Sequence, residues 1–76
     1  MTKRITVLQQ DDCAPDSYEW FEIEFEKMFD ISFKDWKKKA TREIIDEGYG
    51  FKFTLDGIEA YQDAGDPWWT VSKIIV

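Results

Sequence analysis

The stretch FKFTLDGIEAYQ, residues 51–62, decides the fold more than any other part of the chain. Its first half alternates apolar and polar residues, which is typical of a strand with one buried face. Asp56-Gly57 then favours a two-residue hairpin turn, because a type I′ turn needs positive φ at both central residues. Such a turn brings apolar residues of the two strands together. The predicted partners are Leu55 with Ile58, Phe53 with Ala60, and Phe51 with Gln62.

Two further segments have the composition of strands. Residues 68–76, WWTVSKIIV, are aromatic and β-branched and follow a predicted turn at residues 63–67. Residues 4–9, RITVLQ, are also rich in β-branched side chains. Because a chain rarely leaves apolar terminal residues loose, we expect Ile74, Ile75 and Val76 to lie in the sheet or at an interface.

Residues 18–29 fit two periods. At a helical period, one stripe collects the residues Tyr18, Phe21, Phe25, Met28 and Phe29. At a period of two, apolar side chains point one way and three glutamates the other. Asp16 as N-cap with Glu19 as its capping-box partner favours the helix, which would place Trp20 and Ile23 toward solvent. A strand over residues 20–26 is the alternative.

A second helix is predicted from Ser32, which can cap it with Asp35 at the capping-box position. Gly48 is the expected residue after its end. Its apolar stripe consists of Phe33, Trp36, Ala40 and Ile44.

These elements predict one compact α+β domain over residues 1–76. In the preferred order, β-α-α-β-β-β, a three- or four-stranded antiparallel sheet packs on two helices in two layers. If residues 20–26 form a strand, the order becomes β-β-α-β-β-β and the class is unchanged.

Composition narrows the possible functions. The 76 residues contain no histidine and a single cysteine, which removes the commonest general base and the usual zinc ligands. We find no motif for a catalytic site, a cofactor or a metal, so we expect a protein that is not an enzyme. No apolar run reaches the roughly 20 residues of a membrane span, and the low cysteine content favours a cytoplasmic setting.

The charge is segregated along the chain. Residues 11–30 contain eight acids and one lysine, residues 31–42 five bases and one acid, and residues 43–66 seven acids and one lysine, within a net charge of −6. The acidic blocks could be solvated surface, could pair with the basic segment inside the fold, or could dock on a basic partner. Direct contact with nucleic acid is not expected, because the surrounding field is acidic. On a helix, Lys37, Lys38 and Lys39 would also spread over about 200°, so they would not form one basic patch.

The second notable feature of the composition is its four tryptophans. Trp68 and Trp69 are neighbours in a strand and point to opposite faces, so one should enter the core and the other lie on the open face. Exposed tryptophans beside acids are typical of protein-binding surfaces.

The leading hypothesis is a small acidic protein-binding module that inhibits or modulates a nucleic-acid-handling complex. It would compete for a basic groove, in the style of phage-encoded anti-restriction and anti-CRISPR inhibitors. One alternative is a homo-oligomer, such as a homodimer, joined through exposed tryptophans and the C-terminal strand. Another is a carboxylate site for a hard cation. The predicted partner-binding residues are Asp11, Asp12, Glu19, Trp20, Glu22, Glu24, Glu26, Trp68 and Trp69.

Overall fold

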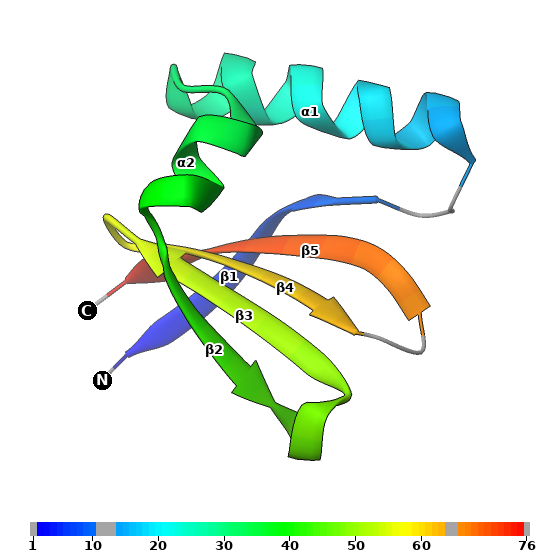
Figure 1. Cartoon of the computed structure of the whole chain (residues 1–76). Coiled ribbons are helices and arrows are strands. Elements are labelled where there is room, and N and C mark those ends of the chain that lie inside the picture. Colours follow the sequence, from blue (N-terminus) through cyan, green and yellow to red (C-terminus); the bar gives the residue numbers. More distant parts are fainter. Residues whose placement is uncertain (1, 11–13, 64–65, 76) are drawn as a thin grey trace.

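The computed structural model describes residues 2–10, 14–63 and 66–75, and it has the predicted α+β architecture (Figure 1). Two helices lie on one face of a five-stranded antiparallel sheet whose strand order is β1-β5-β4-β3-β2. The elements are β1 (Lys3–Gln9), α1 (Pro15–Phe29), α2 (Phe33–Lys39), β2 (Thr41–Ile45), the short 3₁₀ helix η1 (Asp46–Gly48), β3 (Gly50–Leu55), β4 (Ile58–Asp63) and β5 (Asp66–Ile75).

The central hairpin has the predicted register. β3 pairs with β4 so that Leu55 faces Ile58 and Phe53 faces Ala60. Asp56 and Gly57 have φ values of 55° and 76°, the positive values that a type I′ turn requires. The turn chemistry and the apolar alternation both act locally here, which is why the sequence predicts this hairpin well.

The predicted second helix is too long, and its second half is a strand. α2 ends at Lys39, and residues 41–45 form β2, which pairs with β3 at the edge of the sheet. Ile44, expected in a helical stripe, is therefore on a strand and 58% exposed. The β-branched residues of this segment favour a strand once β3 offers a partner. Gly48, with φ of 99°, is the last residue of the short 3₁₀ helix η1 before β3 and does not end α2.

The order is thus β-α-α-β-β-β-β, with one strand more than predicted. Residues 20–26 lie within α1, so the alternative in which they form a strand is wrong. The capping prediction for α1 is also wrong: Ala14 is the N-cap and Pro15 occupies the first turn, where its missing N–H costs nothing. Met28, expected in the buried stripe, is 43% exposed.

The C-terminal strand lies inside the sheet, as expected. β5 is paired with β1 on one side and with β4 on the other. Val76 and residues 64–65 of the predicted turn lie outside the described residues.

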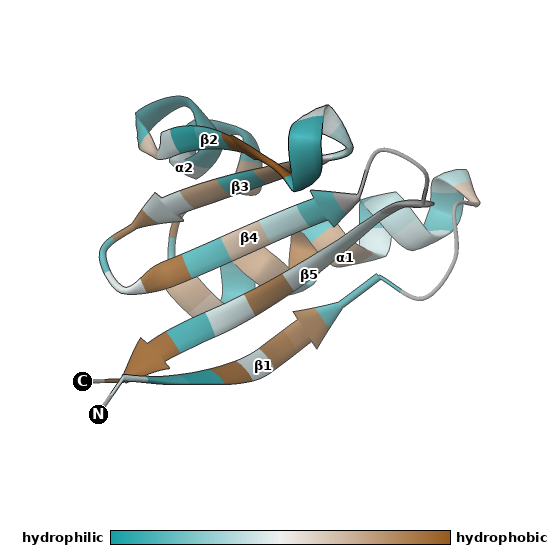
Figure 2. Cartoon of the chain, turned by 90° about the horizontal axis from the view of Figure 1, so that it is seen from below, coloured by the Kyte–Doolittle hydropathy of each residue, from teal (hydrophilic) through white to brown (hydrophobic). Residues whose placement is uncertain are grey.

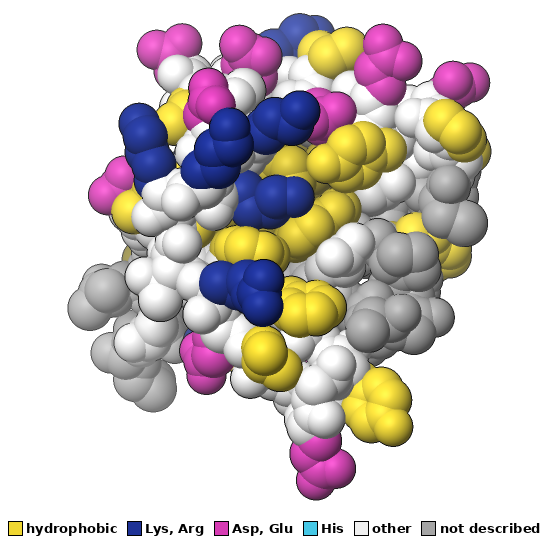
Figure 3. Space-filling model, in the orientation of Figure 1, with side chains coloured by type: hydrophobic (Ala, Val, Ile, Leu, Met, Phe, Trp, Pro, Cys, Tyr) yellow, Lys and Arg dark blue, Asp and Glu magenta, His cyan; other side chains and the backbone are white. Residues whose placement is uncertain are grey.

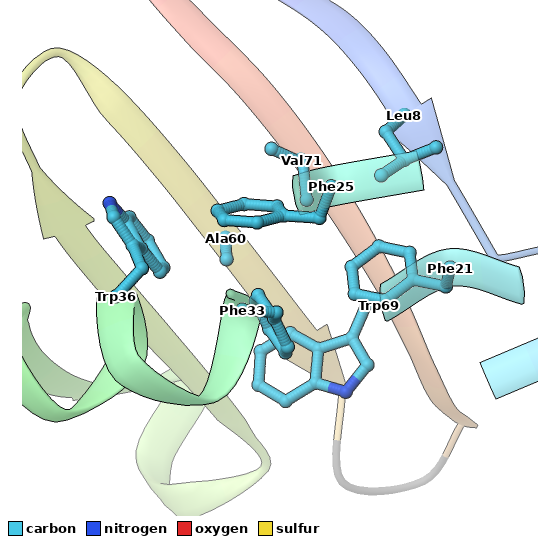
Figure 4. Close-up of a cluster of buried hydrophobic side chains, with 8 residues drawn as sticks. All are labelled: Leu8, Phe21, Phe25, Phe33, Trp36, Ala60, Trp69 and Val71. Atoms are coloured by element: carbon cyan, nitrogen blue, oxygen red, sulfur yellow. The ribbon is translucent and has the colours of Figure 1, made fainter. Parts of the chain in front are cut away.

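The core is an aromatic cluster between the helices and the sheet (Figure 4). Phe33, at the start of α2, meets rings of two other elements: Phe21 and Phe25 of α1 and Trp69 of β5, with ring centroids 4.9–5.0 Å apart. Buried aromatic pairs of this kind contribute beyond their buried area. The fully enclosed members of the cluster, each at most 1% exposed, are Phe21, Phe25, Phe33, Trp36, Ala60 and Val71.

Candidate functional site

The outer side of α1 carries an apolar pair among acids. Trp20 and Ile23 lie three residues apart, and each is 48% exposed, as the helical interpretation predicts. By the same helical spacing, Asp16 and Glu24 adjoin Trp20, while Glu19 and Glu26 adjoin Ile23. We call these six residues the α1 ridge: Asp16, Glu19, Trp20, Ile23, Glu24 and Glu26. Along the helix axis they span about 15 Å.

Electrostatically, the α1 ridge is almost wholly negative. Among the described residues, the ion pair that involves this surface joins Lys27 to Glu24, with the ammonium 3.6 Å from a carboxylate oxygen. Both side chains of this pair are partly exposed, so the pair contributes little to stability. Figure 3 shows acidic side chains along the upper edge of the molecule, where α1 runs.

Glu22 belongs to a different side of α1. It is half-buried, and its charge acts on Lys37 of α2, where it raises the pKa of the ammonium. This electrostatic effect of Glu22 on Lys37 is a weak form of the predicted attraction between the acidic block and the basic segment. Among the described residues, the ion pairs within 4 Å lie elsewhere. Glu22 therefore faces α2 and is not part of the α1 ridge.

The two neighbouring tryptophans separate as predicted. Trp69 is 4% exposed and belongs to the core. Trp68 points to the opposite face of the sheet and is half-buried. Its indole N–H is buried without a hydrogen-bond partner in the described part of the chain. Asp11 and Asp12, the other predicted docking residues, lie outside the described residues.

A basic, aromatic pocket lies where α2 ends and β2 begins, and the sequence interpretation missed it. It has a volume of about 210 Å³, and we call it the Lys37–Arg42 pocket. Five elements line it, through the side chains of Lys37, Arg42, Phe51, Phe53, Gln62 and Trp69. In Figure 3 the Lys and Arg side chains gather over α2 and β2, directly beside exposed hydrophobic side chains.

Cation–π contacts hold both cations over rings. The Lys37 ammonium lies 5.1 Å from the ring centroid of Trp69 and 5.2 Å from that of Phe33. The Arg42 guanidinium lies 5.4 Å from the centroid of Phe51. Contacts of this length are attractive, and they fix where long side chains place their charge.

Partial burial shifts the pKa of the Lys37 ammonium. Burial is the main influence and lowers its pKa, the neighbouring Lys34 lowers it further, and Glu22 opposes both. The sequence held one usable signal for this site. Once residues 41–45 are recognised as a strand, the register sets Arg42 opposite Phe53, which places a cation beside the aromatic face of the hairpin.

Figure 2 shows the sheet from the side away from the helices, and several polar side chains of this face contact one another. Arg4 of β1 reaches across β5 to Glu59 of β4 with an N–O distance of 2.9 Å. Lys52 lies 3.4 Å from Glu43 on the neighbouring strand. The Tyr61 hydroxyl donates a hydrogen bond of 2.9 Å to Asp46 of η1. These contacts connect different elements, and among the described residues they pair Arg4, Glu43 and Lys52 of this face within the chain.

Two further findings concern the residues that the structure describes. They contain no group of three or more Cys, Asp or Glu side chains placed to hold a metal ion. Neither described helix has the length and apolarity to cross a membrane. Comparisons of the chain with protein-family models, with curated proteins and with solved structures give no match.

Proposed function

We propose that this protein is a non-catalytic binding module that docks the α1 ridge on a basic surface of a partner protein. The observation that carries the proposal is the pair Trp20 and Ile23, half exposed on a helix and bordered by four acids. An apolar centre with a charged rim is the usual anatomy of a protein-binding surface. Tryptophan is also among the residues that most often dominate binding energy.

The chemistry of the partner follows from the charge of the α1 ridge. A negative rim about 15 Å long is complementary to a row of Lys and Arg side chains. Nucleic-acid-binding proteins use such rows to bind phosphates, and carboxylates on a rigid helix can form ion pairs with the same Lys and Arg side chains. The proposed role is therefore inhibition or modulation of a nucleic-acid-handling protein by competition for its basic groove.

Assembly into a homo-oligomer through the C-terminal strand is the second candidate, and the sheet topology disfavours it. β5 already has a strand of the same chain on each side. Over residues 70–73 the β5 backbone therefore has no open edge to which another subunit could add a strand.

The test is capture of the partner from source-cell extract by immobilised protein, with identification by mass spectrometry. Reversing two charges in Glu19→Lys/Glu26→Lys should reduce capture at least tenfold. Trp20→Ala should weaken it by a similar factor, since hot-spot truncations cost about 2 kcal/mol or more. The matched control is Glu43→Lys/Glu47→Lys, which changes the net charge equally but lies on β2 and η1.

Two further measurements define the mode of docking. Capture should weaken steeply with salt, because it depends on exposed charges. Excess nucleic acid should displace the protein from its partner if both occupy the same groove. Capture that survives the charge reversals, or a captured partner that nucleic acid does not displace, would overturn the proposal.

A further inference from the structure

We propose that the Lys37–Arg42 pocket binds a small aromatic phosphate, meaning one planar aromatic ring and one phosphate group that are joined directly or through a single sugar. This site is independent of the α1 ridge and lies on different elements. The proposal rests on the charge, the rings and the size of the pocket, which are taken in turn.

The charge of the pocket is unusual for this chain. Two cations and no carboxylate line it, although the whole protein carries a net charge of −6. Neither Lys37 nor Arg42 has a carboxylate within 4 Å among the described residues. An anion that contacts both Lys37 and Arg42 would displace only water, because the fold already holds these two cations in position. A guanidinium matches phosphate geometry with parallel donors, and an ammonium adds a compact second charge.

The rings of the pocket explain why an aromatic ligand fits better than a bare ion. Phe51 and Phe53 lie side by side on the helix-facing side of β3, and both are only partly buried. A planar ring can pack against them or against the Arg42 guanidinium, since arginine stacks on aromatic faces. Gln62 completes the lining on the side of β4.

The size of the pocket limits the ligand. Its volume of about 210 Å³ corresponds to about seven water molecules at roughly 30 Å³ each. Typical pockets for drug-sized ligands start at about 300 Å³. The pocket can therefore hold a ligand with one ring and one phosphate group, whereas a larger dinucleotide would extend into solvent.

Two kinds of ligand have this chemistry, namely an aryl phosphate and a pyrimidine mononucleotide. The probes are phenyl phosphate and cytidine monophosphate, with inorganic phosphate and cytidine as the half-ligands. Binding is followed by chemical-shift changes in a two-dimensional amide NMR spectrum of the full chain. At least one complete probe should bind about tenfold more tightly than either half-ligand, and the shifts should centre on the residues that line the pocket. The tighter of the two complete probes identifies the kind of ligand.

Variants test the individual contacts. Arg42→Gln and Lys37→Gln should each weaken binding at least tenfold, because each removes a charge-assisted hydrogen bond. Lys38→Gln is the matched control, since Lys38 is exposed on the same helix and does not line the pocket. Phe51→Leu should reduce affinity for the complete probe by a larger factor than affinity for inorganic phosphate, because the probe loses its ring contact as well as the ring that positions Arg42.

One variant should improve binding, which a merely structural effect would not do. Glu22 acts electrostatically on Lys37 and lies outside the lining. Glu22→Gln removes this competing negative charge, so affinity for the phosphate should rise about two- to fivefold.

Several outcomes would overturn the proposal. Inorganic phosphate that binds as tightly as the complete probes would exclude a role for the ring, and cytidine that binds equally would exclude a role for the cations. Absence of binding by every probe at millimolar concentration, in a protein whose spectrum shows it folded, would exclude the site. None of these results depends on the partner of the α1 ridge, so the two proposals fail separately.

Discussion

At the scale of single residues, Tyr18 shows how packing changes the chemistry of one side chain. Its ring stacks near Phe21 at the half-buried start of α1, with ring centroids 6.2 Å apart. Burial raises the pKa of its hydroxyl above the ordinary value of about 10, and the nearby Glu22 raises it further. Both influences oppose the negative phenolate.

This shift predicts a loss of stability at alkaline pH. Between about pH 10 and the higher folded-state pKa, the unfolded chain has lost the Tyr18 proton while the folded chain keeps it. Folding then binds a proton, so the free energy of unfolding falls as the pH rises. Tyr18→Phe should remove this part of the slope and stay within about 1 kcal/mol of wild type near neutrality. Urea unfolding of both proteins across this range measures it, and the other two tyrosines are common to both. Identical slopes would show that the hydroxyl is not so perturbed.

At the scale of elements, the hairpin and β2 show what the sequence can and cannot predict. The hairpin follows from neighbouring residues, because Asp56-Gly57 specifies the turn and alternation specifies the register. β2 depends on a partner strand. Phe33, Trp36 and Ile44 happen to continue a helical spacing, and only pairing with β3 decides against it.

The two candidate sites differ in the same way. The exposed side of α1 was predictable, since a helix with one aromatic stripe must turn Trp20 and Ile23 outward. The Lys37–Arg42 pocket was not, because it needs α2 to stop at Lys39 and β2 to align Arg42 with Phe53. Long-range register, rather than local propensity, creates that site.

α2 gives the element-scale prediction. It has seven residues, too few to be stable in isolation, so its cap and its packing must hold it. The Ser32 hydroxyl accepts a hydrogen bond of 3.2 Å from the Asp35 amide, as predicted. Ser32→Ala should lower the free energy of unfolding by about 1 kcal/mol, while Ser32→Thr, which keeps a capping oxygen, should lose only a few tenths. Urea unfolding gives both values, and faster hydrogen exchange at the Asp35 amide should accompany the alanine change. Equal losses in the two variants would rule out a capping role.

At the scale of the whole molecule, the small size of the domain makes each buried ring important. A chain of 76 residues has roughly 4–11 kcal/mol of stability at ordinary values per residue. One aromatic cluster connects the two helices to the sheet, and Phe33 lies where they meet (Figure 4). The α1 ridge and the Lys37–Arg42 pocket both depend on this junction, because it positions α1 and α2 over the strands.

Phe33→Ala should therefore come close to unfolding the whole protein. Removing a buried phenylalanine costs about 3–5 kcal/mol, a large share of the total. Phe33→Leu, which keeps most of the volume, should cost markedly less. Phe29→Ala is a second comparison, since Phe29 is only half-buried and lies at the edge of the cluster. Urea unfolding followed by tryptophan fluorescence and by circular dichroism should give coincident transitions, because one core serves both layers. If Phe33→Ala costs no more than Phe29→Ala, or if helix and sheet signals separate, the two layers are stabilised independently and Phe33 does not join them.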